Sequence, residues 1–282
     1  MIKDRKINKI WAVYFSPTKS TKKITEYVAK QLADIFQLDL CYFDFTLPEA
    51  RKSNIRFSSN DLVVFGMPVY AGRIPNKMVD YVKSIKGEKT SIVTLVTYGN
   101  RSFQDSLIEL KSIFETNNFD LIAAAAFVAE HAMTDVLAKA RPLNYDYEVA
   151  KQFALDIFAK INSNQEKVSE LNIPGNDFVG PYYVPLGLNG EPVNFLKAKP
   201  LTNDSCINCH QCIRHCPMGS IAEDDPKLID GICIKCQSCI HICPVHAKYF
   251  DDQNLLSHIA YLEENFSQKE YKAEISKKAV IK

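Results

Sequence analysis

The sequence predicts an α/β protein, with a doubly wound parallel sheet in its N-terminal part and a small cysteine-rich domain after it. Short apolar runs alternate with helix-like periodicity through residues 1–162, as is typical of parallel strands joined by helices. Eight of the nine cysteines then fall in one short window, from Cys206 to Cys243. We therefore expect an α/β domain over residues 1–162, a packed connector over 163–200, a cysteine-rich domain over 201–251, and a helix and tail over 252–282.

Each strand of the predicted sheet is a short apolar run, and each helix has apolar residues at helical spacing. The strands are expected, in chain order, at residues 10–15, 38–43, 62–65, 92–97 and 121–128. The helices are expected between and after them, at residues 20–35, 76–85, 103–114 and 145–161. The alanines of 123–126 favour a helix by propensity, but their apolar flanks and their place in the alternation favour a strand. The result is a five-stranded parallel sheet.

The connector and the tail differ from both domains in composition. Residues 163–200 hold five prolines and four glycines without a sustained period, which marks a connecting segment. Its apolar and aromatic residues, among them Tyr182 and Tyr183, predict that it packs against one or both domains. Apolar residues at helical spacing predict one amphipathic helix over 255–266. The last sixteen residues hold five lysines and two glutamates, which predicts a solvated tail, with partner docking as the alternative.

The composition excludes several classes of protein. Apolar residues make up 46% and charged residues 24% of the 282, so the chain is neither disordered nor collagen-like. A net charge of +1 gives no overall field that favours nucleic acid. No apolar run is long enough to span a membrane, and the first one is too short for a secretory signal. We therefore expect a cytoplasmic protein, where clustered thiols serve as metal or redox ligands rather than disulfides.

The clustered cysteines form one motif that occurs twice. Cys206-x2-Cys209-x2-Cys212-x3-Cys216-Pro217 recurs 27 residues later as Cys233-x2-Cys236-x2-Cys239-x3-Cys243-Pro244. This is the spacing of bacterial ferredoxins with two [4Fe-4S] clusters, in which the fourth cysteine of each motif crosses to the other cluster. The sequence therefore predicts two clusters. The first takes Cys206, Cys209, Cys212 and Cys243, and the second takes Cys233, Cys236, Cys239 and Cys216.

Structural zinc is the alternative, because eight cysteines could supply two tetrahedral sites. Zinc gives no reason for a third cysteine in each motif or for the proline after each fourth one, so we favour iron–sulfur clusters. The nearby histidines are interpreted as surface residues or neighbours of the clusters rather than ligands: His210, His215, His241 and His246. The ninth cysteine, Cys41, is interpreted as a small buried apolar residue of the second strand.

Hydroxyl side chains cluster directly after the first strand. The run Ser16-Pro17-Thr18-Lys19-Ser20-Thr21 leads into the first helix, and backbone N–H groups at a helix N-terminus bind phosphate. Simple N-capping is the alternative, but one hydroxyl would suffice for it. The chain lacks the GxxxxGK[ST] loop of nucleotidases and the GxGxxG turn of dinucleotide sites. We therefore predict a phosphate site of a different kind.

The hydroxyl loop resembles the FMN-phosphate loop of flavodoxins, which usually carry glycine where this chain has Lys19. The loops after the third and fourth strands, Gly66–Pro75 and Tyr98–Arg101, resemble the two loops that enclose the flavin ring in that family. With the cysteine motifs, the chain resembles flavodoxin–ferredoxin fusion proteins. The resemblance implies a flavodoxin-like domain that binds FMN, followed by a ferredoxin-like domain. It implies the following FMN-binding residues: Ser16, Thr18, Lys19, Ser20, Thr21, Pro68, Val69, Tyr70, Ala71, Gly72, Thr97, Tyr98, Gly99, Asn100 and Arg101.

The residue types in these loops suit a flavin. Tyr70 and Tyr98 offer aromatic faces for stacking. Gly72 and Gly99 permit close backbone approach and positive φ. Two arginines, Arg73 and Arg101, either stabilise negative charge on the flavin or are simply solvated. At the end of the fifth strand, Glu130 and His131 are either rim residues of the site or structural ones.

The two predicted parts support three functional hypotheses. The first is an electron-transfer flavo-iron–sulfur protein that relays low-potential electrons between FMN, the clusters and an external redox protein. The second is an enzyme whose flavin reduces a small substrate, such as a quinone or a nitro compound. The third is a scaffold with a vestigial flavin site. A flavin covered only by Tyr70 and Tyr98 would favour the carrier, and a deep cavity lined by Glu130, His131 and Arg101 would favour the enzyme.

Overall fold

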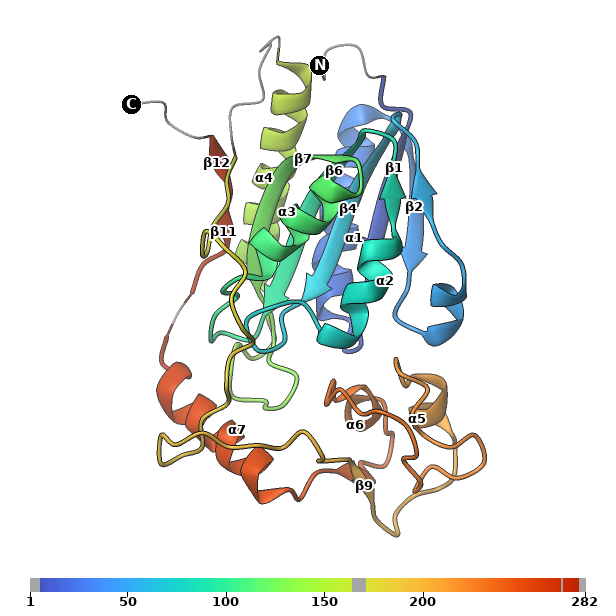
Figure 1. The fold of residues 1–282 in the computed structure, drawn as a ribbon, viewed down its shortest axis with the longest axis vertical. Helices are drawn as coiled ribbons and strands as arrows, with labels where there is room; N and C mark the ends of the chain where they lie inside the picture. The colour runs from blue at the N-terminus through green and yellow to red at the C-terminus, as the bar shows by residue number, and fades with distance from the viewer. Residues whose placement is uncertain (1–5, 164–170, 270, 279–282) are drawn as a thin grey trace.

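The computed structural model describes residues 6–163, 171–269 and 271–278, and Figure 1 shows a helix-covered sheet above a smaller C-terminal part. Six strands form the sheet, in the order β11-β7-β6-β4-β1-β2. Their bounds are Lys9–Tyr14 for β1, Asp39–Asp44 for β2, Asp61–Pro68 for β4, Thr90–Tyr98 for β6, Phe119–Val128 for β7 and Glu274–Ile275 for β11. The first five are all parallel to one another. Counted along the chain their order is 2-1-3-4-5, which is the flavodoxin-like order. The predicted fold class is confirmed.

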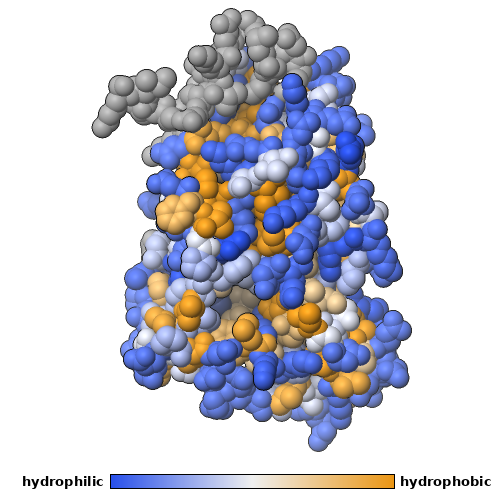
Figure 2. All heavy atoms as spheres, in the orientation of Figure 1, coloured by the Kyte–Doolittle hydropathy of each residue, from blue (hydrophilic) through white to orange (hydrophobic). Residues whose placement is uncertain are grey.

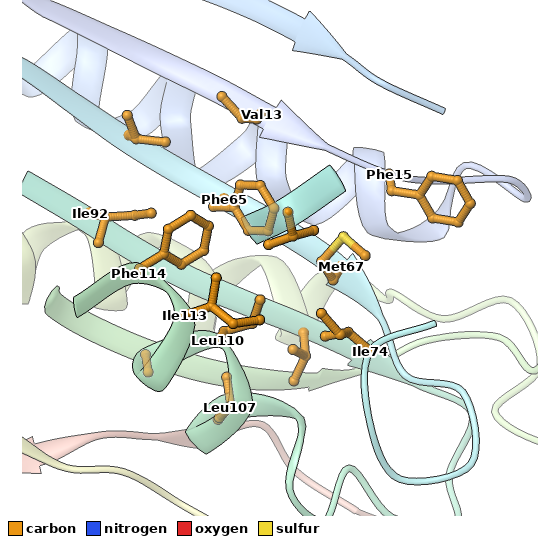
Figure 3. Packing of buried hydrophobic residues seen from close by; sticks show 14 of the residues in the cluster. Val13, Phe15, Phe65, Met67, Ile74, Ile92, Leu107, Leu110, Ile113 and Phe114 are labelled. Carbon is orange, nitrogen blue, oxygen red and sulfur yellow. The ribbon is translucent and has the colours of Figure 1, made fainter. Parts of the chain in front are cut away.

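Helices cover both faces of the sheet, so its central strands are buried on both sides. On one face lie α1 (Ser20–Phe36) and α4 (Asn144–Asn162), and on the other α2 (Val79–Ser84) and α3 (Ser106–Thr116). Figure 3 shows the second face, where Leu110 and Phe114 of α3 pack on Phe65 and Ile92 of the strands. Such double burial explains why the strands read as continuous apolar runs in the sequence.

The alanines of 123–126 lie in strand β7, as predicted from their flanks. Ala124 and Ala126 belong to the apolar cluster on one face, and Ala123 and Ala125 to the cluster on the other. This alternation is the period of two that a strand imposes, and it overrides the helical propensity of alanine. Cys41 is less buried than predicted, because β2 is an edge strand.

The prediction of a solvated tail is wrong for residues 271–278. Strand β11 pairs antiparallel with β7, and Ser276 extends the pairing: its N–H donates to the carbonyl of Ala124 at 2.8 Å, and its Oγ accepts the Ala124 N–H at 2.9 Å. An edge strand leaves backbone groups unpaired, and the tail satisfies those of β7. The lysines that suggested solvation do not oppose pairing by the backbone. Residues 279–282 lie outside the described residues.

The connector packs on the α/β domain, as predicted. The N–H of Tyr183 donates to the carbonyl of Ala71 at 2.9 Å, and the Tyr182 hydroxyl donates to the carbonyl of Ile74 at 2.9 Å.

The remaining described elements are short, except for helix α7. They are η2 Pro48–Lys52, β3 Arg56–Phe57, β5 Lys86–Gly87, η3 Asn76–Met78, β8 Leu171–Asn172, β9 Leu201–Thr202, α5 Gln211–Arg214, α6 Ser238–His241, β10 Lys248–Tyr249, α7 Gln253–Phe266 and β12 Lys277–Lys278. Strands β9 and β10 pair and thereby bring together the two ends of the cysteine-rich segment.

A buried ion pair fixes the start of α4 and the tail. The Arg141 guanidinium donates to both carboxylate oxygens of Asp146 and, through Nη1, to the carbonyl of Tyr271 at 2.9 Å. The Asp146 carboxylate also accepts the N–H of Leu143 at 2.8 Å. The Asp146 side chain is fully buried and that of Arg141 is 8% exposed, so neither charge can be hydrated if the other is lost.

We predict that Asp146→Asn lowers the free energy of unfolding by about 3 kcal/mol, because it leaves a buried guanidinium without its counter-charge. Denaturant unfolding measures the change. The control is Asp34→Asn, which breaks the exposed pair with Lys30 and is expected to cost at most about 0.5 kcal/mol. Equal stability of the two variants would contradict the role assigned to the buried pair.

Candidate flavin cavity and cluster sites

The carboxyl ends of the parallel strands open into a cavity of about 490 Å³. It lies where the α/β domain meets the C-terminal part, and apolar residues gather at this level on the face drawn in Figure 2. This edge of the sheet is where ligands bind in doubly wound folds, and the volume is that of a small-molecule or cofactor site. Every residue predicted to bind FMN lines the cavity, with two exceptions: Lys19 and Asn100.

The hydroxyl loop fits a phosphate better than a simple helix cap. Residues Ser16, Thr18, Ser20 and Thr21 line the cavity at the N-terminus of α1. No side chain caps the helix at Lys19, and the N–H groups of Ser20 and Thr21 in its first turn have no partner among the described residues, so they are available to an anion. The Ser16 Oγ accepts only the N–H of Lys22, at 2.9 Å, and the Thr18 and Ser20 hydroxyls have no partner among the described residues.

Lys19 and Asn100 have conformational and structural roles instead of lining the cavity. Lys19 has a φ of 68°, which explains why glycine is usual at this position in flavodoxins. Asn100 is buried, and its Nδ2 donates to the carbonyls of Phe266 and Lys269 at 2.8 and 2.7 Å. The Asn100 side chain thus anchors the end of α7 and is not free for a cofactor.

The two tyrosines differ in what their rings contact. Tyr70 lines the cavity within electrostatic range of the Cys233 and Cys236 thiols, and burial raises its pKa well above the ordinary value of tyrosine. Tyr98 also lines the cavity, but its ring packs against Phe103 and Tyr271, with centroids at 5.4 and 6.4 Å. Of the two predicted stacking residues, Tyr70 therefore has the freer ring.

Both glycines of the flavin loops are required, for different reasons. Gly72 has a φ of 81°, which side chains rarely adopt. Gly99 lacks that conformation, but a Cβ there would collide with the ring of His131. Gly99 therefore allows the His131 ring to pack directly against the loop backbone.

The two arginines have separate roles. Arg73 forms an ion pair with Glu109 and stacks on Tyr182 at 4.3 Å from the ring centroid, and it does not line the cavity. Arg73 is thus committed to Glu109 and Tyr182, whereas its predicted contact with a flavin stays a prediction. Arg101 does line the cavity, with its guanidinium 3.8 Å from the ring centroid of Tyr183. Burial lowers the pKa of Arg101.

Glu130 and His131 also line the cavity, together with His258 of α7. Burial, with further contributions from His258 and Arg101, lowers the pKa of His131 to about 4. Burial likewise lowers the pKa of His258. Both imidazoles are therefore neutral at pH 7.

A second wall of the cavity was missed by sequence reasoning. It consists of connector, α7 and cysteine-domain residues: Tyr182, Tyr183, Pro185, Phe195, Leu196, Ile232, Cys233, Ile234, Lys235, His258 and Leu262. The sequence signal for this wall was the aromatic residues of the connector. They predicted that the connector packs against a domain, but not which surface it covers. The wall closes over the flavin loops.

The eight clustered cysteines line two small cavities, four to each. One cavity is lined by Cys206, Cys209, Cys212 and Cys243, and the other by Cys216, Cys233, Cys236 and Cys239. Each group thus combines three cysteines of one motif with the fourth of the other. In the described part of the chain, no three His, Cys, Asp or Glu side chains are close enough to hold a single metal ion.

The two motifs share backbone conformation as well as spacing. Positive φ occurs at Asn208 and His210 in the first motif and, 27 residues on, at Lys235 and Gln237 in the second. These turns wrap the chain around each cavity, and backbone N–H groups point at the sulfurs. Ser220, Lys235 and Ala247 donate to the Sγ atoms of Cys216, Cys233 and Cys243 at 3.3, 3.4 and 3.2 Å. A thiolate-bound cluster would be stabilised by these donors.

The cavity with Cys216 adjoins the flavin-sized cavity. Cys233 lines both, as do its neighbours Ile232, Ile234 and Lys235. Two contacts hold the domains at this junction: Arg51 donates to the carbonyl of Pro217, and His241 Nε2 donates to that of Ala132 at 2.8 Å. His241 is thus an interface residue.

No described helix is both long and apolar enough to cross a lipid bilayer. Comparison with known proteins matches residues 203–219 and 231–249 to the 4Fe-4S binding domain family. Among curated proteins, none matches the chain.

Several solved structures overlap the N-terminal half of the chain. A flavodoxin from the domain Archaea is 12% identical, with a TM-score of 0.38, and the overlap covers 55% of this chain and 99% of that one. A Streptococcus pneumoniae TIGR4 flavodoxin is 19% identical, with a TM-score of 0.36, and the overlap covers 54% of this chain and 99% of that one. An apo NADH:FMN oxidoreductase is 14% identical, with a TM-score of 0.40 and 56% and 92% covered.

The fold assignment rests on the strand order of the sheet rather than on these overlaps. The chain combines a flavodoxin-like α/β domain with a segment of the 4Fe-4S binding type, and this combination supports a redox protein of the FMN and iron–sulfur kind.

Proposed function

We propose that the chain is an electron-transfer flavo-iron–sulfur protein, in which two [4Fe-4S] clusters connect an FMN to an external redox protein. The observation that carries this proposal is that Cys233 lines both the flavin-sized cavity and one cysteine cavity. The segment Ile232–Lys235 lines both cavities and forms the wall that they share, so groups held in the two cavities would be neighbours.

The residues that would hold each group follow from the cavities. FMN would take the hydroxyl loop for its phosphate and the loops at residues 68–72 and 97–99 for its ring. The inner cluster would take Cys216, Cys233, Cys236 and Cys239, and the outer one Cys206, Cys209, Cys212 and Cys243. A cluster carries single electrons and FMN carries one or two, so together they would link a one-electron partner to a two-electron site.

The chain's own charges support an outward-facing outer cluster. Ile207, beside Cys206 on the wall of the outer cavity, is 62% exposed. Residues 201–251 hold six acidic and four basic residues, and two of the bases, Lys235 and Lys248, are buried. The surface of this segment is therefore acidic, which suits a redox partner with a basic docking face.

Lys235 has a position of its own between the two sites. Its Nζ donates to the carbonyl of Cys233 at 3.1 Å and to that of Leu196 in the connector. This places a buried positive charge beside the inner cysteines and on the wall of the flavin-sized cavity. A fixed cation there favours the more negative redox state of any group on either side.

A reductase of a small substrate is the second candidate. The cavity is not an open edge covered by two tyrosines, because the connector and α7 form its second wall. Glu130, His131 and Arg101 line it, which is the arrangement expected of an enzyme rather than of a simple carrier. Such a reductase would receive its electrons through the same clusters.

The relay is tested by the rate at which electrons reach the flavin. We use protein prepared without oxygen and a reduced donor protein too large to enter the cavity. Flavin bleaching is expected to follow cluster reduction within one turnover, and Cys216→Ser should slow it at least tenfold at unchanged FMN content. Equal rates in the two proteins would overturn the relay, and a colourless, zinc-containing preparation would overturn the proposal as a whole.

Crossed ligation predicts which cluster each variant damages. Cys216→Ser should remove roughly half of the iron and spare the cluster of Cys206, Cys209 and Cys212, because only the inner set loses a ligand. Cys243→Ser is the matched variant and should do the reverse. Iron and sulfide analysis with electron paramagnetic resonance separates the two clusters. Damage by Cys216→Ser confined to the first motif's own cluster would refute the crossing.

The phosphate site is tested by removing two hydroxyls. Thr18→Ala with Thr21→Ala should weaken FMN binding by at least about a hundredfold, since each lost hydrogen bond to a charged group costs about 1.5–3 kcal/mol and the two together about 3–6 kcal/mol. The iron content should not change. Fluorescence titration of the flavin-free protein with FMN gives the dissociation constant, and Thr116→Ala, at the exposed end of α3, is the control.

A further inference from the structure

Besides Lys77 and Lys235, three basic side chains line the cavity, and none of the three has a carboxylate partner among the described residues. They are Arg101, His131 and His258, and they come from three separate segments: the loop after β6, the loop after β7, and helix α7. Each lies close enough to influence the pKa of at least one other. The carboxylate of Glu130 also lines the cavity, yet no described residue forms an ion pair with it or with Arg101 within 4 Å.

Arg101 is held by uncharged contacts only. Its guanidinium lies over the ring of Tyr183 at 3.8 Å from the centroid, and Nη2 donates to Oε1 of Gln104 at 3.0 Å. These contacts use one face and one corner of the group and leave its remaining N–H donors to the cavity. Arg101 is partly buried, and an anion in the cavity would offset the cost of keeping its guanidinium there without a counter-charge.

His131 presents a hydrogen-bond donor. Its Nδ1 accepts the N–H of Met133 at 3.2 Å, so in the neutral ring the proton is on Nε2. That nitrogen has no partner among the described residues. The ring is fixed against the backbone of Gly99, where no side chain could fit.

His258 presents a hydrogen-bond acceptor. Its Nδ1 donates to the carbonyl of Leu186 at 2.8 Å, so its Nε2 carries the free lone pair. The ring is stacked on Phe195 and Tyr261, at centroid distances of 5.5 and 6.4 Å. These contacts fix its orientation, and its Nε2 too has no partner within the described ranges.

We propose that Arg101, His131 and His258 form a binding site for a small aromatic or conjugated carboxylic acid, between the strand-end loops and the second wall of the cavity. The Arg101 guanidinium would bind the carboxylate of the acid, and the His131 N–H would donate to a second oxygen of the same molecule. The His258 lone pair would accept a hydroxyl or acid proton. Tyr183 and Phe195 supply the aromatic surface that a planar substrate needs. The proposal rests on the second candidate function, because it names the substrate class of that reductase.

FMN carries an anionic group of its own, but its phosphate has a separate place in the structure. The polar contacts of Arg101 are with Gln104 and Tyr183, and none is with the hydroxyl loop at residues 16–21. The hydroxyls and helix N-terminus of that loop already form a phosphate site. The experiment below separates the two sources of negative charge.

The test is calorimetric binding of benzoate to the FMN- and cluster-loaded protein, with benzamide as the uncharged probe of the same shape. We expect benzoate to bind at least tenfold more tightly than benzamide. Arg101→Gln should weaken benzoate binding at least tenfold and leave benzamide binding unchanged. The matched control is Arg56→Gln, at an exposed arginine of β3.

Equal affinity of the wild-type protein for benzoate and benzamide would overturn the proposal, whatever the variants do. A loss of FMN from Arg101→Gln would also overturn it, because the arginine would then serve the cofactor. Neither readout depends on electron transfer, so a failed relay and a failed acid site remain distinguishable. As a second variant, Arg101→Lys retains the charge and should restore part of the benzoate affinity.

Discussion

The junction between the inner cysteine cavity and the carboxyl edge of the sheet is the constraint that organises this protein. The crossed arrangement of the cysteines brings the two motifs together around two cavities, and only one of the cavities can face the sheet. Cys233 and Lys235 line the cavity at the carboxyl edge of the sheet. Two side chains then hold this face in place by donating to backbone carbonyls, Arg51 to that of Pro217 and His241 to that of Ala132.

The connector and α7 make the cavity different from the open edge of a simple carrier. The connector bonds to the flavin loop through Tyr183 and Ala71, and α7 is fastened at its end by Asn100 and on its side by Thr134, whose hydroxyl donates to Glu263. These contacts place His258 and Tyr183 opposite the strand-end loops. The cavity thereby acquires a second wall with its own polar and aromatic side chains.

Charge is distributed unevenly between the inside and the outside of the cysteine-rich segment. Its buried bases, Lys235 and Lys248, are satisfied by backbone carbonyls, whereas its acidic residues remain largely on the surface. Arg101 adds a partly buried cation on the cavity wall. Anionic groups are therefore favoured within the molecule and basic partners outside it.

Sequence alone determined the features that depend on neighbours along the chain. Apolar periodicity gave the five parallel strands and their helices, and covalent spacing gave the two cysteine groups that the structure brings together. The hydroxyl loop could also be predicted, because the end of one strand and the start of the next helix fix its place in the chain. The roles of individual side chains were harder to predict. Arg73 is paired with Glu109, Asn100 anchors the end of α7, and Lys19 adopts a positive φ.

Only the tertiary structure decided which distant segments meet. The lysine-rich tail pairs with β7 because an edge strand offers free backbone groups, and no side-chain pattern encodes that choice. Likewise, the cavity brings Arg101 and His131 of the strand-end loops together with His258 of the second wall, from segments up to 157 residues apart in the numbering. Local patterns report the conformation of a segment, whereas its partners are chosen by packing and by the need to satisfy buried polar groups across the whole chain.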